Sequence, residues 1–328
     1  MIELKNVTKD YKIVKKKPGL RGAVQSLFSH EYEIKTAVNG LSFSISEGEL
    51  VGFIGANGAG KSTTIKMLCG ILTPSSGEIR VNELVPYQQR QKNAKRIGVV
   101  FGQRSQLMWD IAVEESFDLL KHIYDIPEEI YQQNVKEFSE ILNLTPLLRM
   151  PVRKLSLGQK MRCELAAAFL HNPAIVYLDE PTIGLDVAVK RRIRAFIREM
   201  NARMQTTVIL TTHDMQDIEE ICKRIIIIDD GNLLYDGPIA SIRERFGHKR
   251  IIQFDIEEEQ AVLPSELAPH VQFEFDAPSR KVSLTFQNED ISASHVIGLM
   301  LQQYRVLDLT MQDTDIESIV RDIYERGV

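Results

Sequence analysis

The stretch "GFIGANGAGKSTTIKML", residues 52–68, joins an apolar run, a glycine-rich turn and a run of helix formers. It contains the pattern Gly55-x-x-x-x-Gly60-Lys61-Ser62. Glycines let successive backbone N–H groups point inward around phosphate groups, and the lysine reaches the terminal phosphate oxygens. The hydroxyl of Ser62 suits Mg²⁺, and the N-terminus of the following helix favours an anion. The stretch therefore predicts a nucleoside triphosphate site between a strand and a helix.

The chain up to about residue 237 alternates short β-rich runs with helical stretches. This alternation predicts an α/β fold with a largely parallel sheet covered by helices. In such folds the ligand binds at the carboxyl edge of the sheet, where the polar ends of the strands meet. The predicted strands are residues 50–55, 96–101, 174–180, 207–214 and 224–231.

One of these strands, "AIVYLDEP" at residues 174–181, ends in the adjacent carboxylates Asp179 and Glu180. Successive strand residues face opposite ways, so the two carboxylates serve different purposes. Asp179 suits the Mg²⁺ side, and Glu180 at the strand tip suits polarising an attacking water. The alternative, two solvated acids at a turn, is disfavoured by the phosphate loop upstream.

Bulk composition excludes several classes of protein. The 328 residues are 44% hydrophobic and 26% charged, with a net charge of −5, so no overall basic field attracts nucleic acid. The three cysteines lie far apart without zinc-ligand spacing, and we interpret them as core residues. Apolar runs are much shorter than the roughly 20 residues that span a bilayer. We expect a soluble, cytosolic chain that reaches a membrane only through partners.

Two segments stand outside the α/β pattern. Residues 241–328 contain three strand-like and two helix-like regions, including a hairpin about "APSR", and predict a small α+β domain. From residue 240 onward nine basic and sixteen acidic side chains give a net charge of −7, and no motif reveals a function. The other segment is a basic insertion at about residues 14–35. It is either a solvated surface insertion or a basic, partly apolar finger that touches lipid headgroups or a membrane partner.

The motifs taken together, over residues 1 to about 238, resemble the ATPase subunit of an ATP-binding cassette (ABC) transporter. The resemblance implies a P-loop NTPase domain of ABC type over residues 1–240, with a helical subdomain at about 104–172, plus the α+β accessory domain. It implies ATP, bound with Mg²⁺. The implied ATP-binding residues are Tyr11, Gly55, Asn57, Gly58, Ala59, Gly60, Lys61, Ser62 and Thr63.

The resemblance also implies the catalytic and metal-binding residues. It gives catalytic roles to Gln103, Glu180 and His213, a Mg²⁺ role to Ser62, Gln103 and Asp179, and a role in the loop that crosses to the opposing subunit to Asp186. Outside the resemblance, Tyr11 could be a packing residue, Gln103 a loop residue and His213 a structural histidine. His213 follows an apolar strand that ends on the same sheet edge, which favours a place near the γ-phosphate.

The sequence "LSLGQ", residues 155–159, matches the family signature. Ser156 and Gln159 form a Ser-x-x-Gln capping box at the start of an apolar helix. By resemblance, Ser156, Gly158 and Gln159 contact the ATP of the opposing subunit. Leu157 stands where the commonest family form has glycine. The sequence leaves open whether its side chain points away from the nucleotide.

The implied function is ATP binding and hydrolysis for an ABC transporter, with ATP-driven dimer closure coupled to membrane subunits. A narrower resemblance to a bacterial efflux-type branch implies an exporter. The expected partners are two integral-membrane permease subunits and a second copy or a closely related cassette, on the cytoplasmic side of the membrane, with no nucleic acid. Trp109, Ile111 and Phe117 are candidates for the permease groove or for the core. The alternative is a soluble ABC ATPase that acts on ribosomes or nucleic acid, although such proteins usually carry two cassettes or a long coiled coil.

Overall fold

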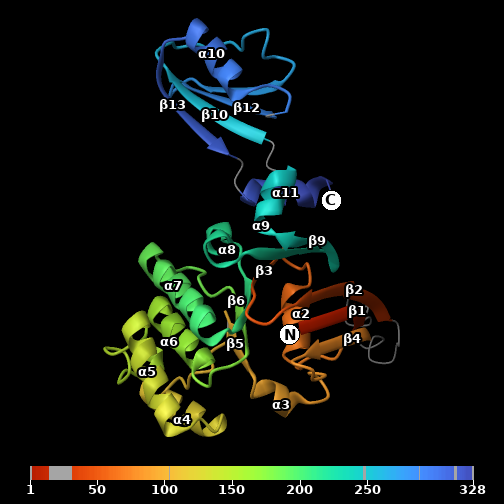
Figure 1. Ribbon diagram of the computed structural model, residues 1–328, viewed down its shortest axis with the longest axis vertical. Coiled ribbons are helices and arrows are strands. Elements are labelled where there is room, and N and C mark those ends of the chain that lie inside the picture. Colours follow the sequence, from red (N-terminus) through yellow and green to blue (C-terminus); the bar gives the residue numbers. More distant parts are fainter. Residues whose placement is uncertain are drawn as a thin grey trace, which may run out of the picture. The chain divides into compact units, whose positions relative to one another are not determined.

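A computed structural model describes residues 2–14, 32–102, 104–246, 249–287, 289–313 and 316–326. The chain forms two compact units, Met1–Asp236 and Gly237–Val328 (Figure 1). Most of the basic insertion, residues 15–31, and the predicted site residue Gln103 lie outside the described residues.

The six-stranded sheet of the first unit has the order β5-β6-β7-β3-β8-β9. Its strand β3 runs parallel to β7 and β8, and β6 runs parallel to β5 and β7. Five of these strands are mostly buried and apolar, as expected where both faces of a sheet are covered, whereas β9 is largely exposed. Their bounds are β3 Leu50–Gly55, β5 Ile97–Phe101, β6 Ile175–Asp179, β7 Thr207–Thr211, β8 Arg224–Asp229 and β9 Asn232–Pro238. The predicted parallel sheet is confirmed.

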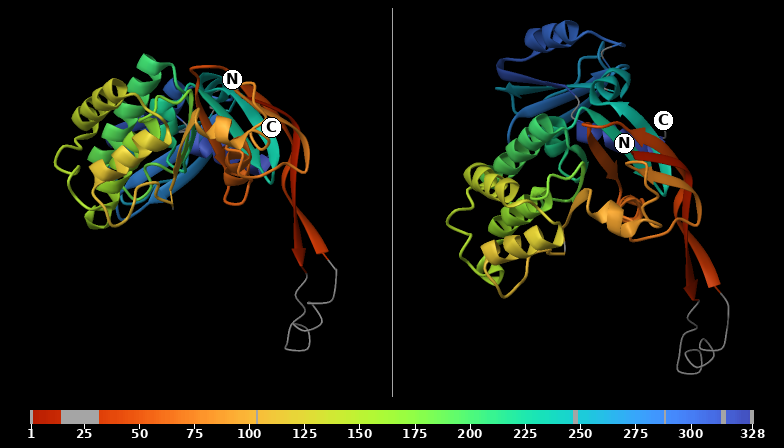
Figure 2. Two further views of the ribbon diagram at one scale, coloured as in Figure 1. Left: turned by 90° about the horizontal axis from the view of Figure 1, so that it is seen from below. Right: turned by 60° about the horizontal axis from the view of Figure 1, so that its bottom comes forward.

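A second, antiparallel sheet has the order β2-β1-β4 and consists of β1 (Ile2–Val14), β2 (Tyr32–Ile45) and β4 (Ser76–Val81). Helix α2 (Lys61–Leu68) contributes Ile65, Met67 and Leu68 to one core shared with both sheets. Figure 2 shows β1 and β2 continuing beyond this sheet as a paired ribbon. The helix that follows the phosphate loop is thus fixed by packing on either side.

Helices α4 (Val113–Ile123), α5 (Glu128–Leu142), α6 (Leu157–Phe169) and α7 (Val187–Met204) lie together on one side of the six-stranded sheet (Figures 1 and 2). Edge-on ring contacts join α5 to α7 and α6 to α7, with ring centroids 5.3 and 5.2 Å apart. The shorter elements are α3 Arg90–Ala94, α8 Met215–Ile221 and the 3₁₀ turn Val152–Lys154. Cys69, Cys163 and Cys222 are free and buried, which confirms them as core residues.

The second unit pairs four antiparallel strands in the order β11-β12-β10-β13 with helices α9, α10 and α11. Ile252, Phe254 and Leu284 from the sheet and Val296 and Met300 from α10 form its core. The hairpin predicted about "APSR" is confirmed, because β11 ends at Asp276 and β12 begins at Lys281. The bounds are α9 Ile239–Phe246, β10 Lys249–Ile256, β11 Val271–Asp276, β12 Lys281–Gln287, α10 Ala293–Gln303, β13 Val306–Asp313 and α11 Ile316–Arg326.

None of the described helices combines the length and the apolar composition needed to cross a bilayer.

Candidate functional site

The predicted site residues gather at the carboxyl edge of the six-stranded sheet. In the parallel register Phe101 of β5 lies beside Asp179 of β6, which lies beside Thr211 of β7. The loops after these strands, and the loop after β3, therefore leave the sheet at the same edge (Figure 1). Register alone brings the residues after Phe101, the Asp179–Glu180 pair, His213 and the phosphate loop toward one place.

The loop between β3 and α2 has the backbone of an anion cradle. Gly60, the residue before α2, has φ +103°, and a Cβ there would lie 2.5 Å from the carbonyl oxygen of Ala37. Only glycine fits that position, because an L side chain would be both strained and in collision. Gly58 has φ +93° with open space where a Cβ would stand. Asn57 and Ser62 are exposed, whereas Ala59 and Gly60 are buried.

Lys61 folds back over this loop. Its Nζ donates to the carbonyl oxygens of Gly55 at 2.5 Å and of Ala56 at 3.2 Å. Burial lowers the pKa of Lys61, and the carboxylates of Glu180 and Asp179 oppose that shift. The lysine and the acidic pair are therefore within electrostatic reach of one another.

Glu180 and His213 form a direct pair. His213 Nε2 lies 3.1 Å from Glu180 Oε1, and the His213 backbone N–H lies 3.4 Å from Oε2. Burial raises the pKa of the Glu180 carboxyl, while His213 and Lys61 act in the opposite direction. Glu180 also has φ +55°, a left-handed conformation that costs a residue with a side chain about 1 kcal/mol or more. Strain of this kind persists only where the surroundings hold the residue in place.

Thr211 holds the strand end that carries the two acids. Its hydroxyl donates to Asp179 Oδ1 at 2.6 Å, and its carbonyl oxygen accepts the Glu180 N–H at 3.0 Å. Asp179 and Glu180 consequently have different surroundings, as the strand alternation predicted. The hydroxyl of Thr211 fixes one carboxylate, and its backbone fixes the conformation of the other residue.

A buried ion pair between Asp217 and Arg194 stabilises the turns that carry Glu180 and His213. Asp217 is fully buried and accepts from Arg194 Nε at 2.5 Å and from the hydroxyls of Thr182 and Thr212. Thr182 follows Glu180 by two residues, and Thr212 directly precedes His213. Asp217 thus ties together the two turns that carry the Glu180–His213 pair. Asp217 and Arg194 were not predicted from the sequence. Each is one of several charged residues in its amphipathic helix, and neither belongs to a motif.

The signature turn has the predicted capping box. Ser156 Oγ accepts the Gln159 N–H at 3.3 Å, and Gln159 Oε1 accepts the Ser156 N–H at 2.9 Å. Ser156 is exposed, and its oxygen acts here as an acceptor, so its own O–H remains available to a ligand. The side chain of Leu157 leans toward Gly184, since a Cβ on Gly184 would lie 3.4 Å from Leu157 Cδ2.

The loop after β5 is tied to the signature helix by Glu164. This residue is 4% exposed, and its carboxylate accepts from the Ser105 hydroxyl and from the Gln106 N–H at 3.2 Å. The side-chain amide of Gln106 donates to the Glu164 carbonyl at 3.1 Å, and Lys160 Nζ lies 5.8 Å from the centroid of the Trp109 ring. Side chains on one face of α6 therefore hold residues 105–109 in place. Glu164 was also missed, because a glutamate in an alanine-rich helix is indistinguishable from a solvated one.

Four other predicted site residues that the structure describes are Tyr11, Gly55, Thr63 and Asp186. Tyr11 of β1 is 36% exposed and pairs with Lys35 of β2, two residues before Ala37, which contacts Gly60. Asp186 caps α7 by accepting the Val189 N–H at 2.9 Å. Gly55 and Thr63 lie at the end of β3 and in the first turn of α2.

The three groove candidates separate in the structure. Trp109 is 60% exposed and Ile111 is half-buried, whereas Phe117 is only 1% exposed. Phe117 is a core residue, because α4 turns that position toward the other helices, so the core alternative is confirmed for it.

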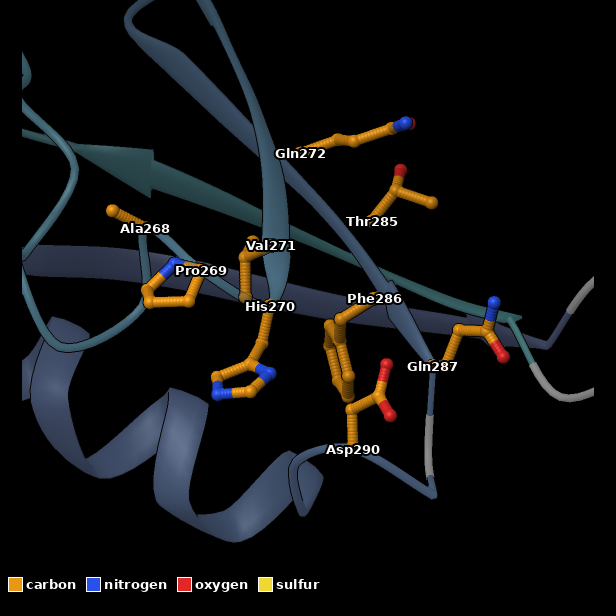
Figure 3. Close-up of a pocket in the computed structure, with 9 residues that line it drawn as sticks. All are labelled: Ala268, Pro269, His270, Val271, Gln272, Thr285, Phe286, Gln287 and Asp290. Carbon is orange, nitrogen blue, oxygen red and sulfur yellow. The ribbon is translucent and has the colours of Figure 1, made fainter.

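A hollow of about 370 Å³ lies in the second unit at the ends of β11 and β12 (Figure 3). Gln272 and Thr285 are cross-strand neighbours that point away from α10, while His270 and Phe286 point toward it. The side chains therefore do not converge on one enclosed space. The predicted site residues that the structure describes all lie in the first unit.

Comparisons with known proteins agree with a nucleoside triphosphate site in the first unit. Residues 38–183 match the family described as ABC transporter. The chain is 30% identical over 305 residues to the linearmycin resistance ATP-binding protein LnrL of Bacillus subtilis (strain 168), covering 90% of this chain and 96% of that protein. It is 36% identical over 243 residues to the Nod factor export ATP-binding protein I of Paraburkholderia xenovorans (strain LB400), covering 74% and 78%.

A solved structure also matches the chain. It is the dimeric post-hydrolysis state of the ATP-binding cassette MJ0796 bound to ADP and Pi, with a TM-score of 0.60 and 27% identity, covering 73% of this chain and 99% of that one. Fold and site thus define a P-loop ATPase. The chain belongs to the ABC transporter family. It is the ATP-binding and ATP-hydrolysing subunit of a transporter.

Proposed function

We propose that two copies of the chain close head to tail on two ATP molecules, so that each ATP lies between one phosphate loop and the other copy's signature. The observation that carries the proposal is the exposed Ser156–Gln159 capping box. Within the described residues, no hydrogen bond or ion pair joins residues 155–159 to the phosphate loop. The capping box occupies the N–H groups of Ser156 and Gln159, so the N–H groups of Leu157 and Gly158 and the Ser156 hydroxyl are the donors that would meet an anion held by another molecule.

The Glu180–His213 pair would carry out the chemistry. A carboxylate with a raised pKa at the strand tip can accept a proton from the attacking water, and His213 at 3.1 Å holds that carboxylate in place. Lys61 would exchange its contacts with the loop carbonyls for phosphate oxygens. Tyr11 would stack on the adenine, and Asp186 would lie at the crossing between the two copies.

Mg²⁺ fits the polar groups of this edge. Among the described residues no group of three or more His, Cys, Asp or Glu side chains could hold a metal ion, whereas Ser62 and Asp179 supply one hydroxyl and one carboxylate. Mg²⁺ commonly binds through one or two protein oxygens plus substrate phosphates and water, so this sparse set is appropriate. Ser62 and Asp179, with Gln103, would hold the ion, which would neutralise charge on the phosphates.

We propose further that the chain serves an exporter and docks on two permease subunits at the cytoplasmic face of the membrane. Met108 and Trp109, 46% and 60% exposed, stand on the loop that Glu164 holds and offer an apolar contact beside the site. The names of LnrL and the Nod factor protein refer to resistance and export, which supports this direction. As part of the same proposal, the chain, with its basic insertion and C-terminal domain, belongs to an efflux-type branch of the family.

The test is the oligomeric state of Glu180→Gln in ATP. This variant keeps the shape of the side chain but loses the base, so it should bind ATP, turn over very slowly and run as a dimer in gel filtration. Lys61→Ala in the same background should remain monomeric. A Glu180→Gln protein that stays monomeric in saturating ATP would refute the shared-site arrangement. Transport direction is tested by following substrate movement in vesicles with the permease genes co-expressed, where uptake in place of export would overturn the exporter proposal.

A further inference from the structure

A second ion pair, between Lys190 and Asp214, stands directly beside His213. Lys190 Nζ donates to Asp214 Oδ2 at 2.6 Å, and Asp214 follows His213 in the chain. The two side chains are 25% and 29% exposed, so this pair is more open to water than the pair of Asp217 with Arg194. The turn that carries His213 therefore has a second support, partly exposed.

Asp214 fixes the backbone on the far side of His213. Its Oδ1 accepts the Gln216 N–H at 3.1 Å and so caps α8, and its own N–H donates to the Thr212 hydroxyl at 3.0 Å. The two carboxylate oxygens of Asp214 have separate partners, because Oδ1 caps the helix and Oδ2 accepts from Lys190. Adjacent Cα atoms are about 3.8 Å apart, so a shift of Asp214 also moves His213.

Helix α7 carries the cations that hold Asp214. Lys190 and Arg194 are four residues apart and lie on one face of α7, which packs beside α8 (Figure 1). Arg194 Nη2 is 3.7 Å from Asp214 Oδ2, a longer contact than that of Lys190. Burial raises the pKa of the Asp214 carboxyl, but Lys190, the Gln216 N–H and Arg194 together outweigh burial and hold that pKa below its usual value. Asp214 is therefore ionised at neutral pH and keeps its pair with Lys190.

We infer that Lys190 is a positioning residue for ATP hydrolysis, which holds His213 against Glu180 by fixing Asp214. The inference rests on the role proposed above for the Glu180–His213 pair. His213 Nε2 lies 3.1 Å from Glu180 Oε1, yet the His213 side chain is 50% exposed. Packing around the imidazole thus does little to hold it, and its place depends on the backbone of its turn.

This turn is anchored at both ends. Thr212, before His213, donates from its hydroxyl to the buried Asp217, and Asp214, after His213, is held by Lys190. With one anchor lost, the turn can pivot about the other. A misplacement of about 1 Å at a catalytic group can cost about 100-fold in rate.

The expected loss is smaller than this limit, because Arg194 still reaches Asp214 when Lys190 is replaced. We expect kcat to fall by roughly 5- to 20-fold. The residues that would bind ATP lie on β1 and on the loop between β3 and α2, so KM for ATP should change by less than about twofold.

The experiment measures steady-state ATP hydrolysis by the full-length chain. Lys190→Met keeps most of the aliphatic stem and removes the charge, and it should show the loss of kcat at constant KM. Lys190→Arg retains a cation with N–H donors and should restore kcat to within about threefold of the wild-type value. Lys136→Met is the matched control, because Lys136 is exposed on α5, and it should leave kcat unchanged.

A variant of Asp214 separates the ion pair from the helix cap. Asn caps a helix about as well as Asp, so Asp214→Asn loses the charge and keeps the cap. It should lower kcat as much as Lys190→Met does. The double variant should be no slower than either single variant, because both substitutions remove the same ion pair. Losses that multiply in the double variant would show that Lys190 acts elsewhere, and a parallel loss of ATP affinity would indicate general unfolding in place of positioning.

The variant His213→Ala distinguishes failure of this inference from failure of the proposed function. If His213→Ala hydrolyses ATP at the wild-type rate, the role proposed for the Glu180–His213 pair is wrong. If His213→Ala is impaired while Lys190→Met keeps kcat within twofold of the wild-type value, only the positioning role of Lys190 is refuted.

Discussion

Removing the Glu164 carboxylate should loosen the loop of residues 105–109 without disturbing the phosphate loop. In the wild-type chain this carboxylate accepts from the Ser105 hydroxyl and the Gln106 N–H. The variant Glu164→Ala leaves both donors without that acceptor. Gln106 is half-buried, so water replaces the lost bond only in part. A donor left in this way costs about 1–3 kcal/mol.

We take about 2 kcal/mol as the expected loss for Glu164→Ala. For a unit of this size that corresponds to a decrease in unfolding midpoint of roughly 4–8 °C. Glu164→Gln keeps one acceptor oxygen but turns an amide toward the other donor, so its loss should be smaller. The exposed residue Glu140 supplies the control, and Glu140→Ala should shift the midpoint by less than about 1 °C.

The stability of the wild-type chain relative to Glu164→Gln should depend on pH, and the pKa of Glu164 gives the direction. Burial raises the pKa of the Glu164 carboxyl, so the folded chain holds that proton more tightly than the unfolded chain. Its contribution to stability is fully present below the unfolded pKa of about 4.3 and is lost as pH rises through the folded pKa. Compared with Glu164→Gln, the wild-type chain should therefore gain stability as pH falls from neutral toward that range.

The fluorescence of Trp109 reports on the conformation of this loop directly, because Trp109 is the only tryptophan in the chain. Acrylamide should quench its fluorescence more strongly in Glu164→Ala than in the wild-type chain, and kcat should fall while ATP affinity stays unchanged. Identical quenching together with an unchanged unfolding midpoint would show that Glu164 does not hold the loop.

Three other predictions concern the site itself. Lys61→Ala should reduce ATP affinity by at least tenfold in equilibrium binding, and undiminished binding would remove Lys61 from the phosphate site. The rate of ATP hydrolysis should fall at acid pH with an apparent pKa above the ordinary glutamate value of about 4.3, because burial raises the pKa of Glu180; a pH–rate profile flat down to pH 4.5 would contradict this. Asp217→Asn should destabilise the first unit by about 2 kcal/mol, since Arg194 Nε loses its buried charge partner and the guanidinium keeps only its pairs with Glu220 at 2.6 Å and Asp214 at 3.7 Å. Urea unfolding measures that loss, and a change below 1 kcal/mol would mean that the ion pair is dispensable.

The parts of the site that could be predicted from sequence are those with local causes. The phosphate loop and the Ser156–Gln159 capping box depend on residues within a few positions of one another. The parallel sheet follows from alternating strands and helices, and its register then collects the polar strand ends at one edge. The turn between Asp276 and Lys281 is likewise a short-range feature.

The parts that could not be predicted depend on contacts between distant segments. Glu164 meets Ser105 across 59 positions, and Asp217 meets Thr182 across 35. No spacing rule distinguishes these buried acids from solvated ones. Packing also determines which side of α4 faces inward and buries Phe117. It likewise places the side chain of Leu157 against Gly184.

The shared site is tested most directly by mixing two inactive variants. Lys61→Ala and Ser156→Ala should each hydrolyse little ATP alone. In a mixed head-to-tail dimer one site contains both substitutions and the other is intact. Mixing should therefore restore single-turnover hydrolysis, up to about a quarter of the wild-type yield, which is the value for fully random pairing. A mixture that yields no more product than the sum of the two variants measured separately would contradict a site built from two copies of the chain.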